Sequence, residues 1–283
     1  MTKKVALVTG ASSGIGYSLA QELASRGYHL IVCSAGERLE SAAEELRAYG
    51  VDVLELQADL ATRQGVEELW DWVKSSGHAI DVACLNAGVG LGGLFKDTDL
   101  DAELKMLELN CVETVHLAKF VVREMAERGE GRILFTSSIA GEMVAPREAV
   151  YAATKAFVLS FAHSLRYELE GSGVTVTTLQ PGPTDTDFFH RAGMEDTKIG
   201  QEGKSDSNAE DVAREGIDAL MAGKDHVYSA SMKTKLEGML ANAIPSRAKA
   251  AMHEKMARTI DAAKQRKAGH NPDGRNGDRR KVS

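Results

Sequence analysis

Three side chains have the types and the spacing of an acid/base site. Tyr151 and Lys155 lie four residues apart in the stretch Tyr-Ala-Ala-Thr-Lys, and Ser138 precedes the tyrosine by thirteen residues. On a helix, residues four apart share one face, so the lysine ammonium would lie near the phenol oxygen. A free tyrosine has a pKa of about 10, and a nearby positive charge lowers it toward the range that a general acid/base for carbonyl and alcohol chemistry needs. The pair alone is not diagnostic, because the same spacing occurs on solvated helix faces.

A glycine-rich stretch near the start of the chain, Thr9-Gly-Ala-Ser-Ser-Gly-Ile-Gly16, strengthens this interpretation. It follows an expected strand and opens an expected helix, which is the context of a phosphate-binding turn. Glycines let the backbone approach a pyrophosphate closely, while free N–H groups and the helix dipole attract the anion. A plain tight turn is the alternative, and the missing Gly-Lys-Ser/Thr ending excludes a nucleoside-triphosphatase loop. Together the motifs predict hydride transfer with a dinucleotide.

The composition of the whole chain restricts the class of protein and of partner. Of the 283 residues, 43% are hydrophobic and 27% are charged, as in ordinary globular proteins, and the net charge of -7 favours neither nucleic acid nor an anionic membrane. The apolar run after Lys3 and Lys4 is too short for a signal peptide, and no run reaches the roughly 20 residues that span a bilayer. We therefore expect a soluble, cytoplasmic protein with a small-molecule substrate.

The cysteines give no sign of a disulfide framework or a metal site. Cys33, Cys84 and Cys111 are odd in number, form no Cys-x-x-Cys pair and are not accompanied by clustered histidines. We expect reduced, mostly buried thiols, with neither a disulfide nor a bound metal.

Short β-branched segments alternate with longer segments of helical spacing, which implies βαβ units and a parallel sheet. The expected strands are nearly continuous apolar runs, as when helices cover both faces of a sheet. They are Val5 to Thr9, His29 to Ser34, Asp52 to Gln57, Val82 to Leu85, Arg132 to Thr136, Val174 to Leu179 and His226 to Ala230. The expected helices are Ile15 to Ser25, Arg38 to Tyr49, Gln64 to Ser75, Asp101 to Glu127, Ala149 to Glu170, Ala209 to Ala222 and Ser246 to Gln265. These predict a Rossmann-type α/β fold with a doubly wound, mostly parallel seven-stranded sheet.

The domain organisation is expected to be simple. No linker rich in proline or serine divides the chain, so residues 1–265 should form one dinucleotide-binding catalytic domain. Within it, residues 187–207 lack clear periodicity and contain three glycines, which predicts a mobile lid, and residues 231–265 should form a helical extension. Residues 266–283 are basic and almost free of apolar side chains, which predicts a disordered tail.

Seven stretches occur in the order in which the short-chain dehydrogenase/reductase family has them, and the chain resembles that family over roughly residues 3 to 230. They are Thr9 to Gly16, Asp59-Leu60, Asn86-Ala87-Gly88, Asn110, Ser138, Tyr151 with Lys155, and Pro181-Gly182 followed by Thr186. The loop spacing Gly-x-x-x-Gly-x-Gly, which differs from the commoner Gly-x-Gly-x-x-Gly fingerprint, is similar to that of the family. The resemblance implies an NAD(P)-dependent oxidoreductase that interconverts an alcohol and a ketone, or a 3-oxoacyl-type carbonyl.

The resemblance also implies which residues hold the cofactor. Asp59 would meet the adenine, Asn86 to Gly88 would support the sheet beside it, and the turn from Pro181 to Thr186 would contact the nicotinamide carboxamide. Taken singly, each has a structural alternative, such as a strand-end cap for Asp59. The full set is Gly10, Ser12, Ser13, Gly14, Ile15, Gly16, Ser34, Arg38, Asp59, Leu60, Asn86, Ala87, Gly88, Tyr151, Lys155, Pro181, Gly182, Thr184 and Thr186.

The choice between NAD and NADP depends on the end of the second strand. An acidic residue there binds the 2'-hydroxyl of NAD, and an arginine accommodates the 2'-phosphate of NADP. The sequence Cys33-Ser-Ala-Gly-Glu-Arg38 has neither an acid nor a base near Ser34, so it departs from both patterns. Ser13 and Ser34 could donate to a phosphate and Arg38 could reach it, which favours NADP(H).

The resemblance implies a role for each member of the acid/base group. Tyr151 would protonate the carbonyl oxygen, Ser138 would stabilise the charge developing on it, and Lys155 would lower the tyrosine pKa and bind the nicotinamide ribose. Asn110 would disturb its helix and hold a water that links Lys155 to solvent; a side chain bonded to local backbone is the alternative. We prefer Ser138 to Ser137 because of its thirteen-residue spacing to Tyr151; side chains alternate along a strand, so only one of the two can face the cleft.

The residues that the resemblance implies should flank the substrate are largely apolar, which favours an apolar alcohol, ketone or acyl chain. They are Leu91, Leu94, Met143, Val144, Phe188, Phe189 and Met194, and Arg147 or His190 could orient a polar group. Each methionine or leucine could instead pack in the core or the lid.

Two other functions fit part of the pattern. A sugar-nucleotide epimerase or dehydratase also uses Tyr-x-x-x-Lys, but such enzymes resemble longer chains with a Gly-x-x-Gly-x-x-Gly loop. A non-catalytic dinucleotide-binding regulator or scaffold would carry degraded catalytic residues, whereas all four are intact here. The family resemblance also implies a homodimer or homotetramer built through the helices at 101–127 and 149–170.

Overall fold

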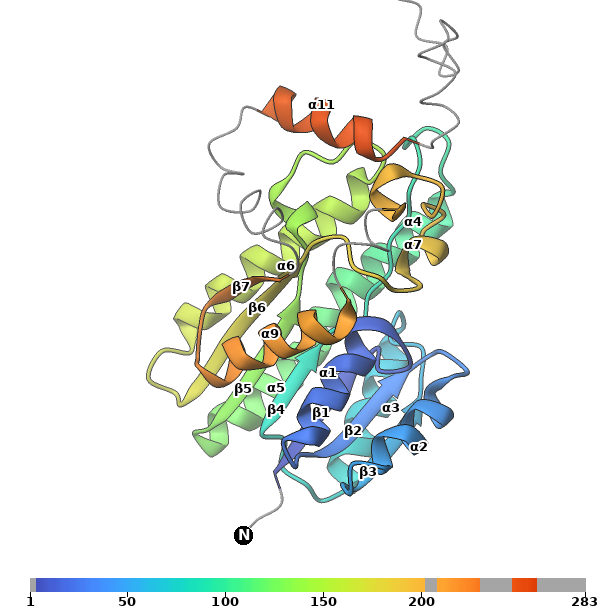
Figure 1. The fold of residues 1–283 in the computed structure, drawn as a ribbon. Helices are drawn as coiled ribbons and strands as arrows, with labels where there is room; N and C mark the ends of the chain where they lie inside the picture. Colours follow the sequence, from blue (N-terminus) through green and yellow to red (C-terminus); the bar gives the residue numbers. More distant parts are fainter. Residues whose placement is uncertain (1–3, 202–207, 230–245, 259–283) are drawn as a thin grey trace, which may run out of the picture.

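The computed structural model describes residues 4–201, 208–229 and 246–258, and their core is one seven-stranded sheet. Its order is β3-β2-β1-β4-β5-β6-β7, and every neighbouring pair is parallel (Figure 1). The strands are β1 Val5–Thr9, β2 His29–Ser34, β3 Val53–Gln57, β4 Val82–Leu85, β5 Gly131–Thr136, β6 Val174–Pro181 and β7 His226–Ser229. The predicted doubly wound, Rossmann-type sheet is therefore confirmed. Ala230, expected to end the last strand, lies outside the described residues.

Helices cover both faces of the sheet, which explains why the strands are apolar on both sides. On one face, α1 Gly14–Ser25, α2 Leu39–Arg47 and α9 Ala209–Met221 bury their apolar residues against the strands. On the other face, α3 Arg63–Ser75, α5 Glu113–Arg128 and α6 Ala149–Glu168 do the same. The three cysteines are free and buried, as the sequence predicted.

The long helix expected over residues 101–127 is interrupted in its middle. Helix α4 Leu100–Leu107 is followed directly by a π-helical turn, η1 Glu108–Val112, and α5 begins at the next residue. Asn110 lies in this turn, and single π-helical turns of this kind are frequent at functional sites. The prediction that Asn110 disturbs its helix is confirmed.

The segment after β6 has more local structure than its irregular sequence suggested. Instead of a featureless loop, it contains the short helix α7 Phe188–Arg191. Phe189 and Met194 from this segment are buried together with Ala257, which directly follows α11 Ser246–Met256. The contacts join two segments far apart in the sequence, so no periodicity within either segment could reveal them. Residues 202–207 of the expected lid, and the expected tail, lie outside the described part.

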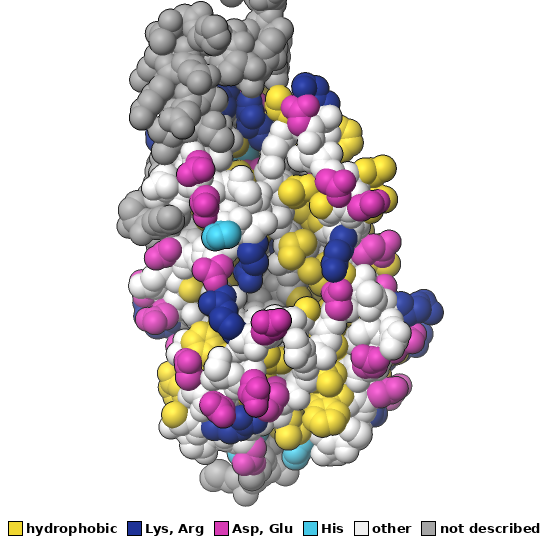
Figure 2. Space-filling model, turned by 90° about the vertical axis from the view of Figure 1, so that its right-hand side faces the viewer, with side chains coloured by type: hydrophobic (Ala, Val, Ile, Leu, Met, Phe, Trp, Pro, Cys, Tyr) yellow, Lys and Arg dark blue, Asp and Glu magenta, His cyan; other side chains and the backbone are white. Residues whose placement is uncertain are grey.

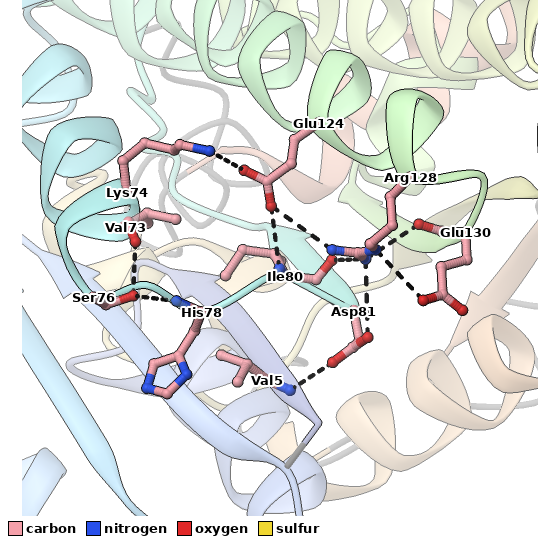
Figure 3. A network of polar contacts seen from close by, with 10 residues as sticks. All are labelled: Val5, Val73, Lys74, Ser76, His78, Ile80, Asp81, Glu124, Arg128 and Glu130. Carbon is pink, nitrogen blue, oxygen red and sulfur yellow. Dashed lines mark hydrogen bonds and ion pairs between the residues drawn. The ribbon is translucent and has the colours of Figure 1, made fainter. Parts of the chain in front are cut away.

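A polar network ties the sheet together at the amino ends of its central strands (Figure 3). The Arg128 guanidinium donates to the Ile80 carbonyl over 2.5 Å and forms ion pairs with Asp81 and Glu124 at 3.9 and 3.8 Å. Asp81 in turn accepts a hydrogen bond of 2.8 Å from the backbone of Val5. The network therefore fixes the starts of β1 and β4 to the end of α5, at the edge opposite the site described below.

Charges of both signs are mixed on the face that Figure 2 shows, with hydrophobic side chains between them. Within the described ranges, no helix combines the length and the apolar character needed to cross a bilayer.

Candidate active site

A cavity of about 340 Å³ opens at the carboxyl ends of the strands. Residues that follow β1, β4, β5 and β6 line it, among them Gly10, Asn86, Ser137 and Gly182. Open α/β sheets bind ligands at this edge where the strand order reverses, which is here between β1 and β4. All the residues predicted to contact the cofactor line this cavity except Arg38.

The glycine loop has the geometry of a dinucleotide cradle. Gly10 and Gly14 adopt left-handed φ values of 70° and 57°, which side chains with a Cβ rarely adopt. A Cβ on Gly16 would lie 2.1 Å from the Gly10 carbonyl oxygen, so the first turn of α1 can pack against the loop only with glycine there. The N–H groups that open α1 are therefore accessible to an anion, and the loop fits a pyrophosphate.

Asn86 holds this loop to the neighbouring strand. Its side-chain amide donates to the Thr9 carbonyl over 3.0 Å. The Thr9 hydroxyl accepts two hydrogen bonds of 3.0 Å from the backbone N–H groups of Asn86 and Ala87. The geometry matches the supporting position predicted for Asn86 to Gly88.

The adenosine end of the cavity is polar. The hydroxyls of Ser12 and Ser34 lie 2.9 Å apart. Asp59 accepts hydrogen bonds from the Ala61 backbone and from Lys105, each at 3.0 Å, and these bonds lower the pKa of its carboxyl. Asp59 thus caps a turn as well as lining the cavity, so the predicted position and its structural alternative both apply.

Arg38 lies outside this cavity and pairs with Asp187, the residue before α7. Both side chains line a neighbouring surface pocket together with Ser12 and Ser13. Arg191 of α7 lies 3.4 Å from the Ser13 hydroxyl. The segment after β6 therefore contacts the glycine loop through Arg191, and it contacts Arg38, the residue before α2, through Asp187.

The predicted acid/base group meets at the other end of the cavity. Ser138 forms a hydrogen bond with the Tyr151 hydroxyl, and the Lys155 ammonium lies 5.8 Å from the centre of the Tyr151 ring. All three side chains are buried. The neighbouring Ser137 instead donates to the Lys155 carbonyl over 2.7 Å, so its hydroxyl is committed to the backbone of α6. This distinction agrees with the preference for Ser138.

One electrostatic prediction about this group is wrong. The sequence suggested that Lys155 lowers the pKa of Tyr151, but burial first and the charge of Glu148 second raise that pKa. The Lys155 ammonium donates to the Thr136 carbonyl over 3.0 Å rather than to the phenol, and burial lowers its own pKa to about 8. Desolvation of the buried Tyr151 phenol thus outweighs the attraction of the Lys155 ammonium, which lies 5.8 Å from the ring centre. In this geometry Tyr151 is a proton donor at neutral pH.

Asn110 is fixed beside this group by three hydrogen bonds. Its amide oxygen accepts from the Val89 N–H over 3.0 Å, and its amide nitrogen donates to the Val89 carbonyl over 2.9 Å and to the Thr154 hydroxyl over 3.0 Å. A Cβ on Gly88 would lie 3.1 Å from the Asn110 oxygen and 3.3 Å from the Lys155 nitrogen. Gly88 therefore leaves room for these two polar atoms to approach each other.

The residues predicted to flank the substrate divide into two groups. Met143, Phe188 and Phe189 line the cavity. Leu91 packs against the cluster that contains Tyr151, Val144 is exposed, and Met194 is buried beside Phe189. Leu94 is half-buried, Arg147 pairs with Glu254, and His190 is exposed.

Several lining residues escaped the sequence analysis. Glu148, one helical turn before Tyr151, forms a hydrogen bond with His253 of α11 at the wall of the cavity. The position of Glu148 could have been noticed from its spacing to Tyr151, whereas His253 lies 105 residues away with no local motif. Other unforeseen lining residues include Ile139, Ala140, Arg191, Ile199 and Met256.

Together, a glycine cradle at one end and a buried phenol at the other define a dinucleotide-dependent oxidoreductase of CH–OH and C=O groups. The family model for short chain dehydrogenases matches residues 4–196, and the chain belongs to that family. It is 34% identical over 232 residues to 1-deoxy-11-beta-hydroxypentalenate dehydrogenase of Streptomyces exfoliatus, covering 81% of this chain and 83% of the relative. It is 36% identical over 190 residues to glycine betaine reductase ATRR of Emericella nidulans, covering 67% of this chain but only 15% of that protein.

Solved structures share the fold along nearly the whole chain. A short-chain dehydrogenase from Sphingobium yanoikuyae in complex with NADPH superposes with a TM-score of 0.73 at 25% identity, covering 98% of this chain and 99% of that one. A short chain dehydrogenase/reductase from Burkholderia phymatum in complex with NAD gives a TM-score of 0.76 at 22% identity, covering 95% and 96%. The second likeness concerns the fold alone.

Proposed function

We propose that this protein interconverts a neutral, largely apolar alcohol and the corresponding ketone, with Tyr151 as the acid/base. The observation that carries the proposal is the Tyr151 hydroxyl, buried in the cavity and hydrogen-bonded to Ser138. A bound nicotinamide supplies or accepts the hydride at the substrate carbon. The remaining chemistry is proton transfer at the substrate oxygen, for which a buried phenol is suited.

The roles of the chain's residues follow from their hydrogen bonds. In the reduction direction, Tyr151 transfers its hydroxyl proton to the carbonyl oxygen, and Ser138 donates a hydrogen bond to the same oxygen as negative charge develops on it. Lys155 then lies next to a phenolate, which it stabilises. Asn110 keeps the π-helical turn and the Val89 backbone in place beside the ammonium.

NADP(H) is the proposed cofactor in preference to NAD(H). Support comes from the absence of an acidic side chain at Ser34 and from the paired hydroxyls of Ser12 and Ser34, which could donate to a 2'-phosphate. Arg38 reaches the same side of the loop, although it is paired with Asp187.

The experiment that tests this function is a screen of apolar ketones with NADPH and NADH, and of the matching alcohols with the oxidised cofactors, followed at the nicotinamide absorbance. We expect turnover of cyclic or branched apolar substrates, with kcat/KM at least about tenfold higher for NADPH than for NADH. A preference of similar size for NADH would contradict the choice of cofactor. If the protein binds the dinucleotide but turns over none of the ketones or alcohols, a non-catalytic regulator would be favoured.

A homodimer or homotetramer is proposed as the working assembly. Exposed hydrophobic side chains gather on α4, η1 and α6, where the sequence predicted an interface; they are Leu100, Leu104, Leu107, Val112 and Phe157. Exposed apolar patches of this kind are typical of interaction surfaces. Light scattering coupled to size-exclusion chromatography measures the assembly, and a monomer at micromolar concentration would contradict it.

A further inference from the structure

A buried, hydrogen-bonded pair of polar side chains that the proposed chemistry does not use lies at the wall of the cavity. The Glu148 carboxylate and the His253 imidazole lie 2.7 Å apart, and each side chain is only 4% exposed. Both line the cavity that contains Tyr151. Burying such a pair costs desolvation free energy, and well-packed apolar residues could fill the same space without that cost. The pair therefore calls for an explanation in terms of what the cavity binds.

The backbone around Glu148 is held in an unusual conformation. Arg147 has a φ of 73° and is the sole non-glycine residue with a positive φ among those that the structure describes. Its carbonyl accepts a hydrogen bond of 2.8 Å from the Gly93 N–H. Strained backbone of this kind clusters at functional sites and persists only when surrounding contacts impose it. Here it sets the direction in which the chain enters α6, one residue before Glu148.

An ion pair between Arg147 and Glu254 also joins α11 to the residues just before α6. Arg147 lies 3.4 Å from Glu254, with side chains 13% and 15% exposed. Figure 1 shows α11 at the end of the molecule where α4 and α7 also lie. Within the described ranges, neither Arg147 nor Glu254 lines the cavity, whereas Glu148 and His253 do. Both pairs therefore join α11 to the start of α6, but of the two only Glu148–His253 lies at the cavity wall.

The cavity that Glu148 and His253 line also has apolar side chains in its wall. Met143, Phe188, Phe189, Ile199 and Met256 are among them. Binding pockets of this composition use a few polar groups to fix the orientation of a ligand. A polar pair in such a wall discriminates between ligands, because a ligand without a matching polar group leaves it unsatisfied.

We propose that Glu148 and His253 form a substrate subsite that binds a second hydrogen-bonding group, an uncharged hydroxyl, on the otherwise apolar alcohol or ketone. This inference rests on the proposed function and names the class of substrate. The hydroxyl can donate to the carboxylate and accept from the imidazole. An anionic group is disfavoured, because the charge of Glu148 already acts on Tyr151 and would repel a second negative charge.

The test compares cyclohexanol with its 1,2-, 1,3- and 1,4-diols as substrates, with NADP+ as the oxidant. In the wild-type protein we expect one diol to exceed cyclohexanol in kcat/KM by about tenfold or more, beyond the factor of about two from its second hydroxyl. His253→Phe keeps an aromatic ring of similar size but removes both nitrogens. It should lower this diol-to-cyclohexanol ratio by about tenfold, whatever happens to the rate with cyclohexanol itself.

Glu254→Gln is the matched control, because it weakens the docking of α11 without changing a residue of the cavity wall. It should leave the ratio within about twofold of the wild-type value. A diol-to-cyclohexanol ratio that falls equally in both variants would show that the Glu148–His253 pair only docks α11. A wild-type protein whose kcat/KM for every diol is close to that for cyclohexanol would also overturn the subsite.

Binding gives a readout that does not depend on turnover. Thermal shifts of the NADP+-loaded protein should show stabilisation by one diol in the wild type and in Glu254→Gln, and its loss in His253→Phe. Diol binding without oxidation would contradict the proposed function but support the subsite. Oxidation of cyclohexanol without any diol preference or diol-specific thermal shift would support the proposed function but contradict the subsite.

Discussion

The Lys155 ammonium lies 5.8 Å from the centre of the Tyr151 ring and donates its hydrogen bond to the Thr136 carbonyl, not to the phenol oxygen. The lysine therefore acts on the tyrosine through space and through the charge that forms during the reaction. Because burial raises the pKa of Tyr151, the phenol keeps its proton at neutral pH, as the proposed role of proton donor to a carbonyl oxygen requires.

Replacing Tyr151 with phenylalanine tests this role of the hydroxyl. Loss of a general acid lowers rates by about 10² to 10⁴, so kcat for ketone reduction should fall by about that factor. Binding of NADPH, measured by fluorescence titration, should change little because the ring remains. Tyr167→Phe on the exposed side of the same helix is the control and should keep full activity. Near-normal turnover in Tyr151→Phe would refute the mechanism.

The two adjacent serines should differ in what their loss changes. Ser138→Ala removes the donor proposed to bind the reacting oxygen, and loss of one such donor lowers kcat by about 10² to 10³. Ser137→Ala removes a buried hydrogen bond to the Lys155 carbonyl, which should lower the free energy of unfolding by about 1 kcal/mol with a mild effect on kcat. Steady-state kinetics and urea denaturation of both variants measure the two quantities. Equal effects of both substitutions on kcat would contradict the assignment.

The sequence predicted what is local in this site. The glycine loop, the Tyr151–Lys155 pair and the strand ends each depend on residues close together in the chain, and parallel strands bring their carboxyl ends to one edge. The family resemblance added Ser138 and Asn110, whose positions the structure brings next to Tyr151 and Lys155. These parts could therefore be predicted with their residue numbers.

The remaining features depend on contacts between distant segments. His253 meets Glu148 across 105 residues, and Arg38 meets Asp187 across 149. No spacing rule predicts such contacts, because they depend on how the segment after β6 and α11 pack over the cavity. The error about the Tyr151 pKa has the same origin, since burial of the phenol depends on the whole fold.

The charge of Glu148 should shift the pH dependence of alcohol oxidation. Oxidation needs the phenolate, so its rate rises with pH toward the pKa of Tyr151, which burial and Glu148 raise. Glu148→Gln removes the negative charge that disfavours the phenolate, so the pKa falls and the rise in kcat/KM moves to lower pH. Profiles between about pH 6 and 10 measure the shift, with Glu142→Gln as a carboxylate control outside the contacts of Tyr151. An unchanged profile, or one moved to higher pH, would contradict this electrostatic effect.

Asp187 should limit how strongly the protein prefers NADP(H). Its carboxylate pairs with Arg38, which holds the pKa of that carboxyl below its usual range and keeps it charged at neutral pH. A 2'-phosphate must compete with Asp187 for the guanidinium, so Asp187→Asn should raise the ratio of kcat/KM for NADPH to that for NADH by a factor of about 3 to 10. Both side chains are more than half exposed, so the gain should shrink at high salt.

Asp185→Asn is the matched control for this prediction, because it makes the same change of charge two residues earlier, on a side chain with no resolved ion pair to Arg38. It should leave the NADPH-to-NADH ratio within about twofold, and Arg38→Ala should lower that ratio instead. Equal increases in the two asparagine variants would mean that overall charge, rather than competition for Arg38, governs the preference. A ratio unchanged in Arg38→Ala would mean that the guanidinium does not contact the 2'-phosphate, so the preference would have to come from the hydroxyls of Ser12 and Ser34.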